Sequence, residues 1–247
     1  VIGACSGVGV IRGIIASAPT IDDIVATPTG FLSTVLDANG NQTATLVASG
    51  SNRRAVTIDE IPKNLQHAFV AIEDERFYDH NGIDVTGIIR AGVKGVASGF
   101  HFSEGASTIT QQLLKNTVFT SWTSESSMAD KFERKFQEQY LALQLEKVVD
   151  KDWILENYLN AINLGQNTLG VGVASERYFG KDVSDLTLSE CAVLAAITQN
   201  PSKYNPITNP QENAKRRMKV LNNMKDQGYI SQDEYDEAVA DNVYDRI

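Results

Sequence analysis

The sequence contains few residues of the kinds that build covalent frameworks or transition-metal sites. Its 247 residues include two cysteines, Cys5 and Cys191, and three histidines, His67, His80 and His101. Two cysteines are too few for a disulfide framework, and no cysteine or histidine has a partner at the short spacing of a zinc site. The sequence therefore argues against a disulfide-stapled domain and against a zinc enzyme.

Basic residues are outnumbered by acidic ones. The chain has 22 lysines and arginines against 31 acids, for a formal net charge of −9. That sign argues against a protein whose whole surface binds nucleic acid or an anionic bilayer, although it leaves room for a local basic site. With 42% hydrophobic and 21% charged residues, the composition is that of a globular protein, and the length fits one large domain or two small ones.

The first 18 residues are the main candidate for contact with a membrane. They are small and apolar apart from Arg12, and they begin at Val1 rather than at a methionine. A complete span needs about 20 apolar residues, so we interpret residues 1–18 as the remaining turns of a transmembrane helix. A buried helix and a disordered tail are the alternatives, and the high glycine content disfavours a soluble helix.

The rest of the chain is expected to be helical apart from one hairpin. Two strand-like runs, residues 31–36 and 43–47, flank an Asn-Gly pair, which is typical of a β-hairpin; a plain loop is the alternative. Asp59 is expected to cap the first helix, and capping boxes at Thr187 and Ser231 open two late ones. Apolar spacing and breakers predict further helices over residues 85–98, 107–118, 129–149, 151–162 and 170–179, and one from Asn209-Pro210 to Gly228.

An acidic segment, EDERFYDHNGID, covers residues 73–84. A solvated charge run at a helix end is the plain interpretation. Glu73, however, directly follows an apolar helix face that contains Phe69 and Ile72, and Phe77 comes soon after. A carboxyl group beside apolar side chains is suited to proton transfer, because burial disfavours its charged form. Glu73 is therefore a candidate for acid–base chemistry.

Two further segments could serve an anionic ligand. In residues 105–116, GASTITQQLLKN, small polar residues stand where a helix begins, and backbone N–H groups at such a start favour an anion. A capped surface helix is the plain interpretation. In residues 134–146, Arg134 and Glu138 share a helix face. They form either a surface ion pair or a cation and a carboxylate that face the same cleft as Glu73.

Two more segments cover residues 154–171 and 192–206. Taken alone, each of them indicates a core helix with a structured end. In this order, however, the five segments resemble the peptidoglycan glycosyltransferases, the family found in class A penicillin-binding proteins and in monofunctional transglycosylases. The resemblance extends from the hairpin, near residue 31, to roughly residue 228. The motifs read EDERFYDHNGID, GASTITQQLLKN, RKFQEQYLALQLEK, ILENYLNAINLGQNTLGV and AVLAAITQNPSKYNP.

The resemblance implies a mainly α fold, a lysozyme-like two-lobed helical domain with a small N-terminal β-hairpin. Residues 1–18 would then be the membrane remnant, 19–58 the linker and hairpin, and 59–247 the glycosyltransferase domain, with a membrane-facing lobe around 85–125. A glycine-rich stretch over residues 95–105 carries Phe100 and Phe102. These rings either enter the bilayer interface or pack within the lobe.

The family's chemistry implies roles for both glutamates. Its members polymerise lipid II, a lipid-linked disaccharide-pentapeptide, into β-1,4-linked glycan strands with inversion. By resemblance, Glu73 is the catalytic base for the 4-hydroxyl of the incoming sugar, and polyprenyl pyrophosphate is the leaving group. Glu138 is the second catalytic glutamate. It orients the pyrophosphate, directly or through a divalent cation, or it stabilises the oxocarbenium-like centre.

The substrate-binding residues implied by the resemblance supply cations for the pyrophosphate and polar groups along the sugar path. Capping alone is the alternative for Ser107 and Thr108, and packing is the alternative for the two glutamines. Asp74 and His80 are expected to support local structure. The implied set is Arg90, Ser107, Thr108, Gln111, Gln112, Lys115, Arg134 and Lys135.

The resemblance implies no required cofactor. It leaves open whether a divalent cation, Mg²⁺ or Mn²⁺, binds at the pyrophosphate, and it does not identify the metal ligands. The implied partners are lipid II, the growing glycan strand, the membrane, moenomycin-type inhibitors and a C-terminal transpeptidase domain in the full-length protein. Nucleic acid is not among them. The implied location is the bacterial cell membrane, with a single span and the catalytic domain on the extracytoplasmic face.

Two other functions compete with polymerisation. A lysozyme-like hydrolase or lytic transglycosylase would also use a glutamate in a helical cleft, and a non-catalytic scaffold would use none. The arginines and lysines favour the transferase, because a glycosidase has no pyrophosphate to neutralise. The sequence departs from the family at Leu164, where an aromatic residue is common, and at Gln166, where histidine occurs. These departures affect only the end of that helix.

Overall fold

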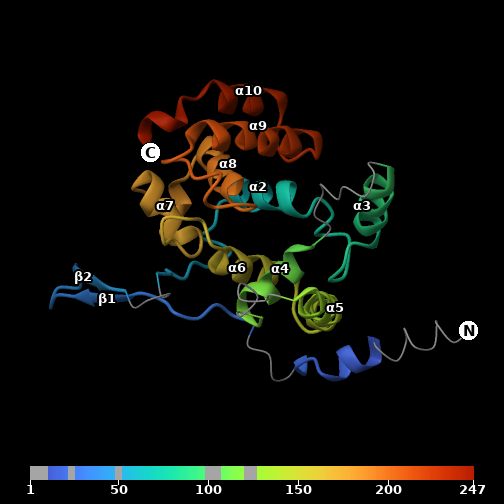
Figure 1. Cartoon of the computed structure of the whole chain (residues 1–247). Helices are drawn as coiled ribbons and strands as arrows, with labels where there is room; N and C mark the ends of the chain where they lie inside the picture. The colour runs from blue at the N-terminus through green and yellow to red at the C-terminus, as the bar shows by residue number, and fades with distance from the viewer. Residues whose placement is uncertain (1–10, 22–25, 48–51, 98–106, 120–126) are drawn as a thin grey trace, which may run out of the picture. The chain divides into compact units, whose positions relative to one another are not determined.

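The computed structural model describes residues 11–21, 26–47, 52–97, 107–119 and 127–247 (Figure 1). In these ranges the chain is mainly helical with one two-stranded antiparallel sheet, which confirms the expected fold class. The elements are β1 (Ser33–Leu36), β2 (Gln42–Leu46), α2 (Lys63–Glu73), α3 (Val85–Ala97), α4 (Ile109–Thr117), α5 (Met128–Leu145), α6 (Lys151–Ala161), α7 (Val171–Phe179), η3 (Val183–Asp185), α8 (Leu188–Ile197), α9 (Pro210–Asp226), α10 (Gln232–Ala240) and η4 (Val243–Arg246).

The chain forms two compact units, each made of two segments. The first unit comprises Val1–Thr27 and Arg76–Ile154, and the second comprises Pro28–Glu75 and Leu155–Ile247. Helices α3, α4 and α5 belong to the first unit, and α2 and α7–α10 belong to the second. Helix α6 contains the boundary.

The core of the second unit is built around α8. Every residue from Ser189 to Ile197 is buried, and α8 packs against α2, α7, α9 and α10. Figure 1 shows α8 beside α2 and α9. A helix that is apolar on all sides must be covered on all sides, which explains why α8 lies at the centre. The predicted capping box at Thr187 is present, with Thr187 accepting from Glu190 N.

Helix α2 begins later than expected. Its N-cap is Pro62, which makes no side-chain capping bond, and Asp59 is exposed in a preceding turn, so the predicted Asp59 cap is wrong. The buried Gln66 amide explains the difference. Its Nε2 donates to Ile58 O over 3.0 Å and to Ile61 O over 2.8 Å, and these bonds stabilise the turn in front of the helix.

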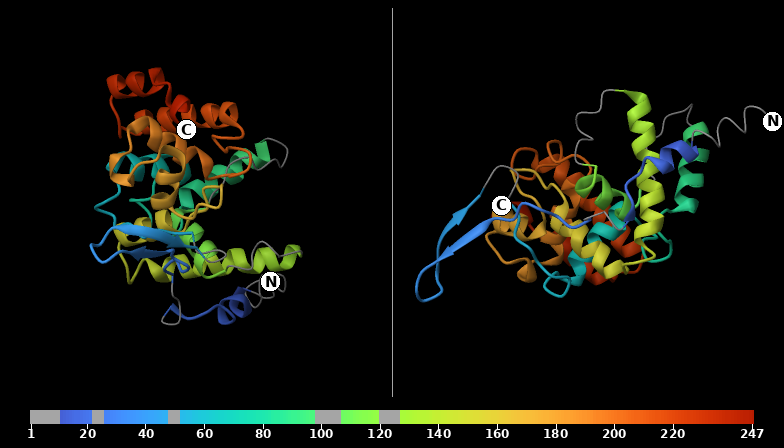
Figure 2. Two further views of the ribbon diagram at one scale, coloured as in Figure 1. Left: turned by 90° about the vertical axis from the view of Figure 1, so that its left-hand side faces the viewer. Right: turned by 90° about the horizontal axis from the view of Figure 1, so that it is seen from below.

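The predicted hairpin is confirmed and belongs to the second unit. Strands β1 and β2 pair antiparallel, with Ser33 opposite Leu46. Asp37 shapes the loop, since its Oδ1 accepts from Asn39 N and Asn41 N over 2.8 Å each. Figure 2 shows the two strands side by side. All four residues of β1 are exposed.

The first unit contains a close contact between the turn before α3 and helix α5. Gly82 has a φ of +87°, and a Cβ atom at this position would lie 2.5 Å from the backbone of Ala142. Thr108 Oγ1, just before α4, donates to Gly82 O over 2.7 Å, and α4 packs on α5. Helix α5 ends at Leu145 rather than at the expected residue 149. Beyond it, Glu146 binds Lys151 across 2.6 Å.

The N-terminal segment is helical over residues 11–16, and residues 1–10 lie outside the described ranges. Gln137 of α5 donates through Nε2 to Ile14 O over 3.3 Å and to Ser17 Oγ over 3.1 Å. Within the described residues, no helix combines the length and apolarity needed to cross a bilayer. Phe100 and Phe102, named above as interface candidates, lie outside the described ranges as well.

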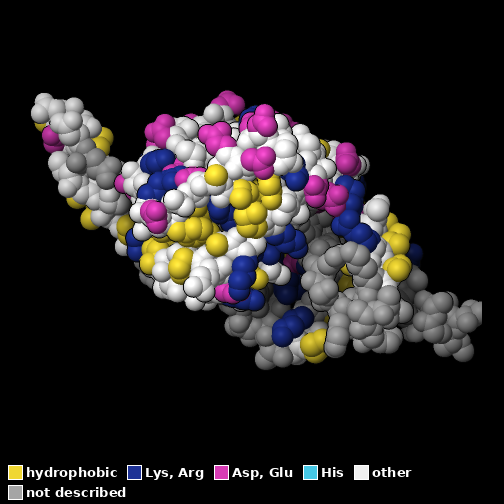
Figure 3. All heavy atoms as spheres, turned by 90° about the horizontal axis from the view of Figure 1, so that it is seen from above, with side chains coloured by type: hydrophobic (Ala, Val, Ile, Leu, Met, Phe, Trp, Pro, Cys, Tyr) yellow, Lys and Arg dark blue, Asp and Glu magenta, His cyan; other side chains and the backbone are white. Residues whose placement is uncertain are grey.

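Much acidic charge lies on the outer surface of the second unit. Helix α10 exposes four acids, Asp233, Glu234, Asp236 and Glu237. Figure 3 looks down on this side and shows acidic side chains spread over it. The net charge of −9 therefore includes surface acids that take no part in the core of the unit.

Candidate active site

The predicted site residues fall in both units. Glu73 belongs to the second unit, whereas the other nine belong to the first. The structure brings together two groups, one around Glu73 and one around Glu138. The nine residues in the first unit are Arg90, Ser107, Thr108, Gln111, Gln112, Lys115, Arg134, Lys135 and Glu138.

Glu73 is the last residue of α2, and that helix end is held by α9. The side chains of Asn223 and Gln227 donate to Ala71 O over 2.9 and 3.1 Å. A helix leaves its last carbonyl groups without intrahelical partners, so these two amides satisfy one of them. The next residue, Asp74, is 6% exposed and donates through its N–H to Val70 O. The direction in which Glu73 leaves the helix is therefore fixed.

The Glu73 carboxylate lies against two polar side chains of its own unit. Thr198, the C-cap of α8, donates through Oγ1 to Glu73 Oε1. Arg216 Nη2 lies 3.3 Å from the same oxygen. The Glu73 side chain is 13% exposed, so it is largely enclosed yet open to solvent at one point. An ionised carboxylate in this arrangement can accept a proton from a hydroxyl group.

Sequence reasoning gave Arg216 no role. The helical period could have indicated this contact. Asn223 and Gln227 follow Arg216 by seven and eleven residues, a spacing that places all three on one side of α9 and its C-cap. All three contact the last three residues of α2.

Tyr158 of α6 is fully buried in the second unit, with its ring edge-on to Phe69 at 6.2 Å. Burial raises the pKa of the Tyr158 hydroxyl, and the negative charges of Glu73 and Asp74 raise it further. The phenol therefore stays neutral beside these carboxylates and adds no negative charge.

Glu138 of α5 is the centre of the group in the first unit. Its side chain has no exposed surface, and it contacts Arg134 Nη1 and, across 2.9 Å, Lys135 Nζ. The predicted shared face of Arg134 and Glu138 is confirmed. The Arg134 and Lys135 side chains are 14% and 41% exposed, so both cations reach solvent while their counter-charge does not. The group presents positive charge outward.

Ser107 and Lys135 meet in the same group. Lys135 Nζ donates to Ser107 Oγ over 2.7 Å, which joins α5 to the segment before α4. A hydroxyl, an ammonium and a guanidinium near a helix start are the donors that an anionic phosphate group requires.

Thr108 and Gln111 form a capping box that the sequence analysis did not identify as one. Thr108 Oγ1 accepts from Gln111 N over 3.2 Å, and Gln111 Oε1 accepts from Thr108 N over 3.2 Å. Both residues are 1% exposed. Capping, left open as the alternative for Thr108, is present. Contact of these two side chains with substrate stays a prediction.

The three other predicted binding residues are more accessible. Arg90 is exposed on α3, and Gln112 and Lys115 are half-buried on α4. Close to α3, Asp84 accepts from Arg76 and from Gly87 N, the latter over 2.9 Å. Burial opposes the shift, but these bonds lower the pKa of Asp84. Asp84 therefore stays ionised at the start of α3, where negative charge is favourable.

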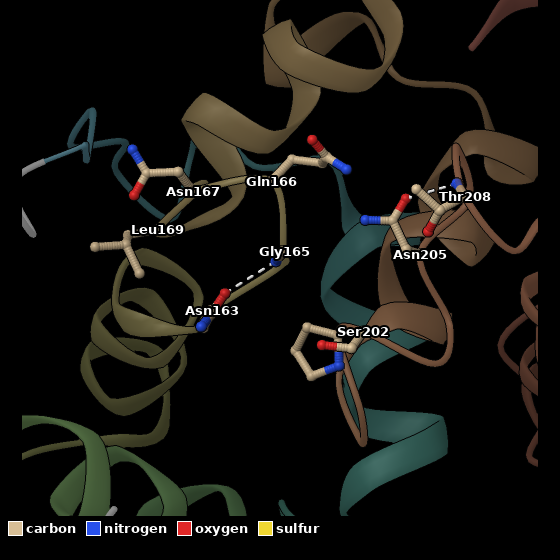
Figure 4. A pocket seen from close by; sticks show the side chains of 9 residues that line it. Asn163, Gly165, Gln166, Asn167, Leu169, Ser202, Asn205 and Thr208 are labelled. Atoms are coloured by element: carbon tan, nitrogen blue, oxygen red, sulfur yellow. Dashed lines mark hydrogen bonds between the residues drawn. The ribbon is translucent and has the colours of Figure 1, made fainter.

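The second unit contains a polar cavity of about 450 Å³. Figure 4 shows the lining side chains, with Asn163 bonded to Gly165 N over 2.9 Å and Asn205 bonded to Thr208 N over 3.1 Å. Amide and hydroxyl groups of this kind form hydrogen bonds with sugar hydroxyls. The lining is Asn163, Gly165, Gln166, Asn167, Leu169, Pro201, Ser202, Asn205 and Thr208.

The backbone in the cavity wall is unusual. Gln166 and Asn167 have positive φ values of 48° and 57°, which non-glycine residues adopt rarely. Asn52 Nδ2 donates to Asn167 O over 2.6 Å and supports the turn. Among the described residues, no group of three or more His, Cys, Asp or Glu side chains is placed to bind a metal ion.

Comparison with known proteins gives the following matches. A family model described as Transglycosylase matches residues 39–225. Penicillin-binding protein 1A of Clostridium perfringens strain 13 is 43% identical over 237 residues, which is 93% of this chain and 34% of that protein. Penicillin-binding protein 1F of Bacillus subtilis strain 168 is 46% identical over 200 residues, 81% of this chain and 26% of that protein.

A solved structure, penicillin-binding protein 1A from Haemophilus influenzae, matches with a TM-score of 0.48 and 24% identity, over 87% of this chain and 21% of that one. The chain spans about a third or less of the length of the curated relatives named here.

Proposed function

Since the chain belongs to the transglycosylase family and is thus a peptidoglycan glycosyltransferase module, we propose that it polymerises lipid II with Glu73 as the general base. The single observation that supports this role is the position of the Glu73 carboxylate. It ends a fixed helix, is mostly enclosed, and lies beside Arg216 and Thr198.

The proposed step is one displacement at the anomeric carbon of the growing chain. The 4-hydroxyl oxygen of the incoming lipid II sugar forms the new bond as Glu73 takes its proton. The bond to the polyprenyl pyrophosphate breaks, and its electron pair leaves with the phosphate oxygen. Displacement from the opposite side converts an α-linked phosphate into a β-1,4 glycosidic bond. The configuration is therefore inverted.

We place the leaving pyrophosphate at the group around Glu138. Arg134 and Lys135 supply positive charge, Ser107 supplies a hydroxyl, and Glu138 orients both cations from a buried position. Fixed cations stabilise charge that develops on a leaving group. The exposed Arg90 and the half-buried Lys115 and Gln112 would contribute further along the same substrate.

The polar cavity is proposed to bind sugar rings of the growing glycan. Its amide side chains suit neutral, hydroxyl-rich rings better than a lipid tail, because they offer donors and acceptors but little apolar surface.

We further propose that the first unit lies against the bilayer that carries the substrate. Helix α3 exposes Val85, Ile89 and Val93 at four-residue spacing, with 56%, 62% and 65% of their surfaces accessible. A stripe of this kind suits an interfacial position. A single span before the domain, an extracytoplasmic location and a following transpeptidase domain are parts of the same proposal, taken from the family.

Labelled lipid II tests the proposal. The chain should convert it into long glycan, and Glu73→Gln should reduce the rate by at least about 1,000-fold while the melting temperature stays near that of the wild type. Assays with EDTA and with added Mg²⁺ or Mn²⁺ test divalent cation dependence. Moenomycin should inhibit the wild type.

The alternatives predict different products. A hydrolase or lytic enzyme would release soluble fragments from finished peptidoglycan and form no polymer from lipid II. A scaffold would be unaffected by Glu73→Gln. Either result would overturn the assignment.

A further inference from the structure

Arg216 is the arginine whose contact with the Glu73 carboxylate links helices α9 and α2. The two residues are 143 positions apart in the sequence, and Nη2 lies 3.3 Å from Oε1. The Arg216 side chain is 10% exposed, so water screens the pair only in part.

Other contacts fix the guanidinium independently of Glu73. Arg216 Nη1 donates to Gln199 Oε1 over 2.8 Å, and Cζ lies 5.1 Å from the centre of the Tyr204 ring. Helix α9 is itself anchored next to this ring, because Asn213 Nδ2 donates to Tyr204 O over 2.8 Å. The cation is therefore positioned before a substrate arrives.

The neighbouring basic residues of α9 are arranged differently. Arg217 is buried on another face and donates to Ser189 Oγ over 2.7 Å and to Ala238 O, so it links α9 to α8 and α10. The Lys215 side chain is 73% exposed and binds only the surface residue Glu212 among the partners seen in the described ranges. Of three consecutive basic residues, Arg216 is the one that faces the carboxylate.

We propose that Arg216 is a positioning residue for the general base, an inference that rests on the proposed function. Its guanidinium holds the Glu73 carboxylate oriented toward the acceptor hydroxyl, because Arg216 is itself fixed by Gln199 and Tyr204 and contacts Glu73 Oε1. Arg216 exchanges no proton with the substrate and acts only through the Glu73 carboxylate.

The test compares Arg216→Gln, Arg216→Lys and the control Lys215→Gln in lipid II polymerisation. Arg216→Gln should lower kcat about 100-fold with KM changed less than about 3-fold, since misplacing a catalytic group costs rate rather than affinity. Arg216→Lys keeps the charge but loses the fork of donors, so it should recover about a tenth of the wild-type rate. Lys215→Gln should behave as the wild type.

Two readouts separate positioning from simple loss of structure. Methylguanidine should restore part of the rate of Arg216→Gln and should not increase the wild-type rate. In addition, the losses of rate caused by Glu73→Gln and Arg216→Gln should not add in the double variant, because Arg216 acts only through Glu73.

The outcomes are distinct from failure of the proposed function. If the wild type forms no polymer from lipid II, the function itself is wrong. If the wild type is active and Arg216→Gln matches its kcat, the positioning role is wrong. A loss of rate that methylguanidine does not change, together with additive losses of rate in the double variant, also overturns it.

Discussion

Lys135 Nζ lies 2.7 Å from Ser107 Oγ, so a cation of α5 is hydrogen-bonded to the hydroxyl that precedes α4. The same ammonium donates to Glu138 Oε2 over 2.9 Å. Two contacts on different elements fix the direction of a side chain that is otherwise long and flexible. Positive charge is thereby placed in advance at the proposed pyrophosphate site, where a mobile lysine would have to be ordered by the substrate.

Replacement of Lys135 should weaken substrate binding more than replacement of Ser107. We expect Lys135→Gln to raise KM for lipid II about 10-fold, the loss of one charge-assisted contact. Ser107→Ala should raise it about 2-fold or less, because Glu138 still orients the ammonium. Lys131→Gln, an exposed position one turn earlier on α5, is the control. Equal effects of the Lys135 and Lys131 variants would contradict this placement of the phosphate.

Glu138 should also matter for stability. Glu138→Gln leaves Arg134 and Lys135 without a buried counter-charge, and we expect a loss of about 2 kcal/mol in the free energy of unfolding. Breaking a fully buried pair costs roughly 3–5 kcal/mol, but here both cations reach solvent. Urea denaturation measures the loss. Glu212→Gln, which breaks the exposed pair with Lys215, should cause no measurable change. A stable Glu138→Gln protein would show that the cations are satisfied by other groups.

The close contact at Gly82 predicts a severe effect of a single methyl group. In Gly82→Ala the new Cβ would lie 2.5 Å from Ala142 backbone atoms, at a φ of +87°. Backbone must move, so we expect a loss of about 3 kcal/mol or more in unfolding free energy. Gly180→Ala has a similar positive φ of +63° with nothing within 4 Å and should cost about 1 kcal/mol. Thermal denaturation of both variants tests the difference, and equal losses would exclude the steric explanation.

Local signals in the sequence predicted most of the helical architecture. Gly180 ends α7 in a left-handed conformation, and Thr187 and Ser231 form their capping boxes, because each of these devices acts within a few residues. Asp59 failed as a cap since a side chain further along, Gln66, stabilises a competing turn. The Thr108–Gln111 box was visible in the spacing, but capping was only the alternative to a substrate contact for Thr108, and packing was the alternative for Gln111.

Sequence spacing predicted only those contacts of the site whose residues are close together in the sequence. Arg134 and Glu138 are four residues apart on one helix, so the helical period alone places them together. Glu73 meets Thr198 and Arg216 across 125 and 143 residues, and no local rule connects such positions. These contacts depend on how α2, α8 and α9 pack, which is a property of the folded core. The resemblance supplied Glu73 itself but not the residues that position it.

The polar cavity predicts a change in glycan binding without a change in stability. Gln166 is exposed at its rim, and its side chain makes no hydrogen bond in the described structure. Gln166→Ala should raise the apparent KM for lipid II about 3-fold, in line with the loss of a neutral hydrogen bond to a sugar, and leave the melting temperature unchanged. The exposed Gln232→Ala on α10 serves as the control. An unchanged KM would place the glycan elsewhere.

The pair formed by Asp241 and Arg246 predicts how stability depends on acid. Both carboxylate oxygens of Asp241 accept from the guanidinium, over 2.8 and 2.6 Å. These hydrogen bonds lower the pKa of Asp241 to about 2, against partial burial, which opposes the shift. Because the pKa is lower in the folded state than in the unfolded state, the contribution to stability is complete above about pH 4. It is lost as the pH falls from there to about 2.

Asp241→Asn should therefore lower the melting temperature at pH 7 by on the order of 2 °C, a small value because the pair is partly exposed to solvent. The difference from the wild type should stay constant down to about pH 4.5 and shrink below it. Asp236→Asn, an exposed position on α10, should show no such pH-dependent difference. If the Asp241→Asn difference persisted unchanged at pH 2.5, the bond to Arg246 would not be what the carboxylate contributes, because protonation of Asp241 in the unfolded state at that pH should already have removed much of the contribution.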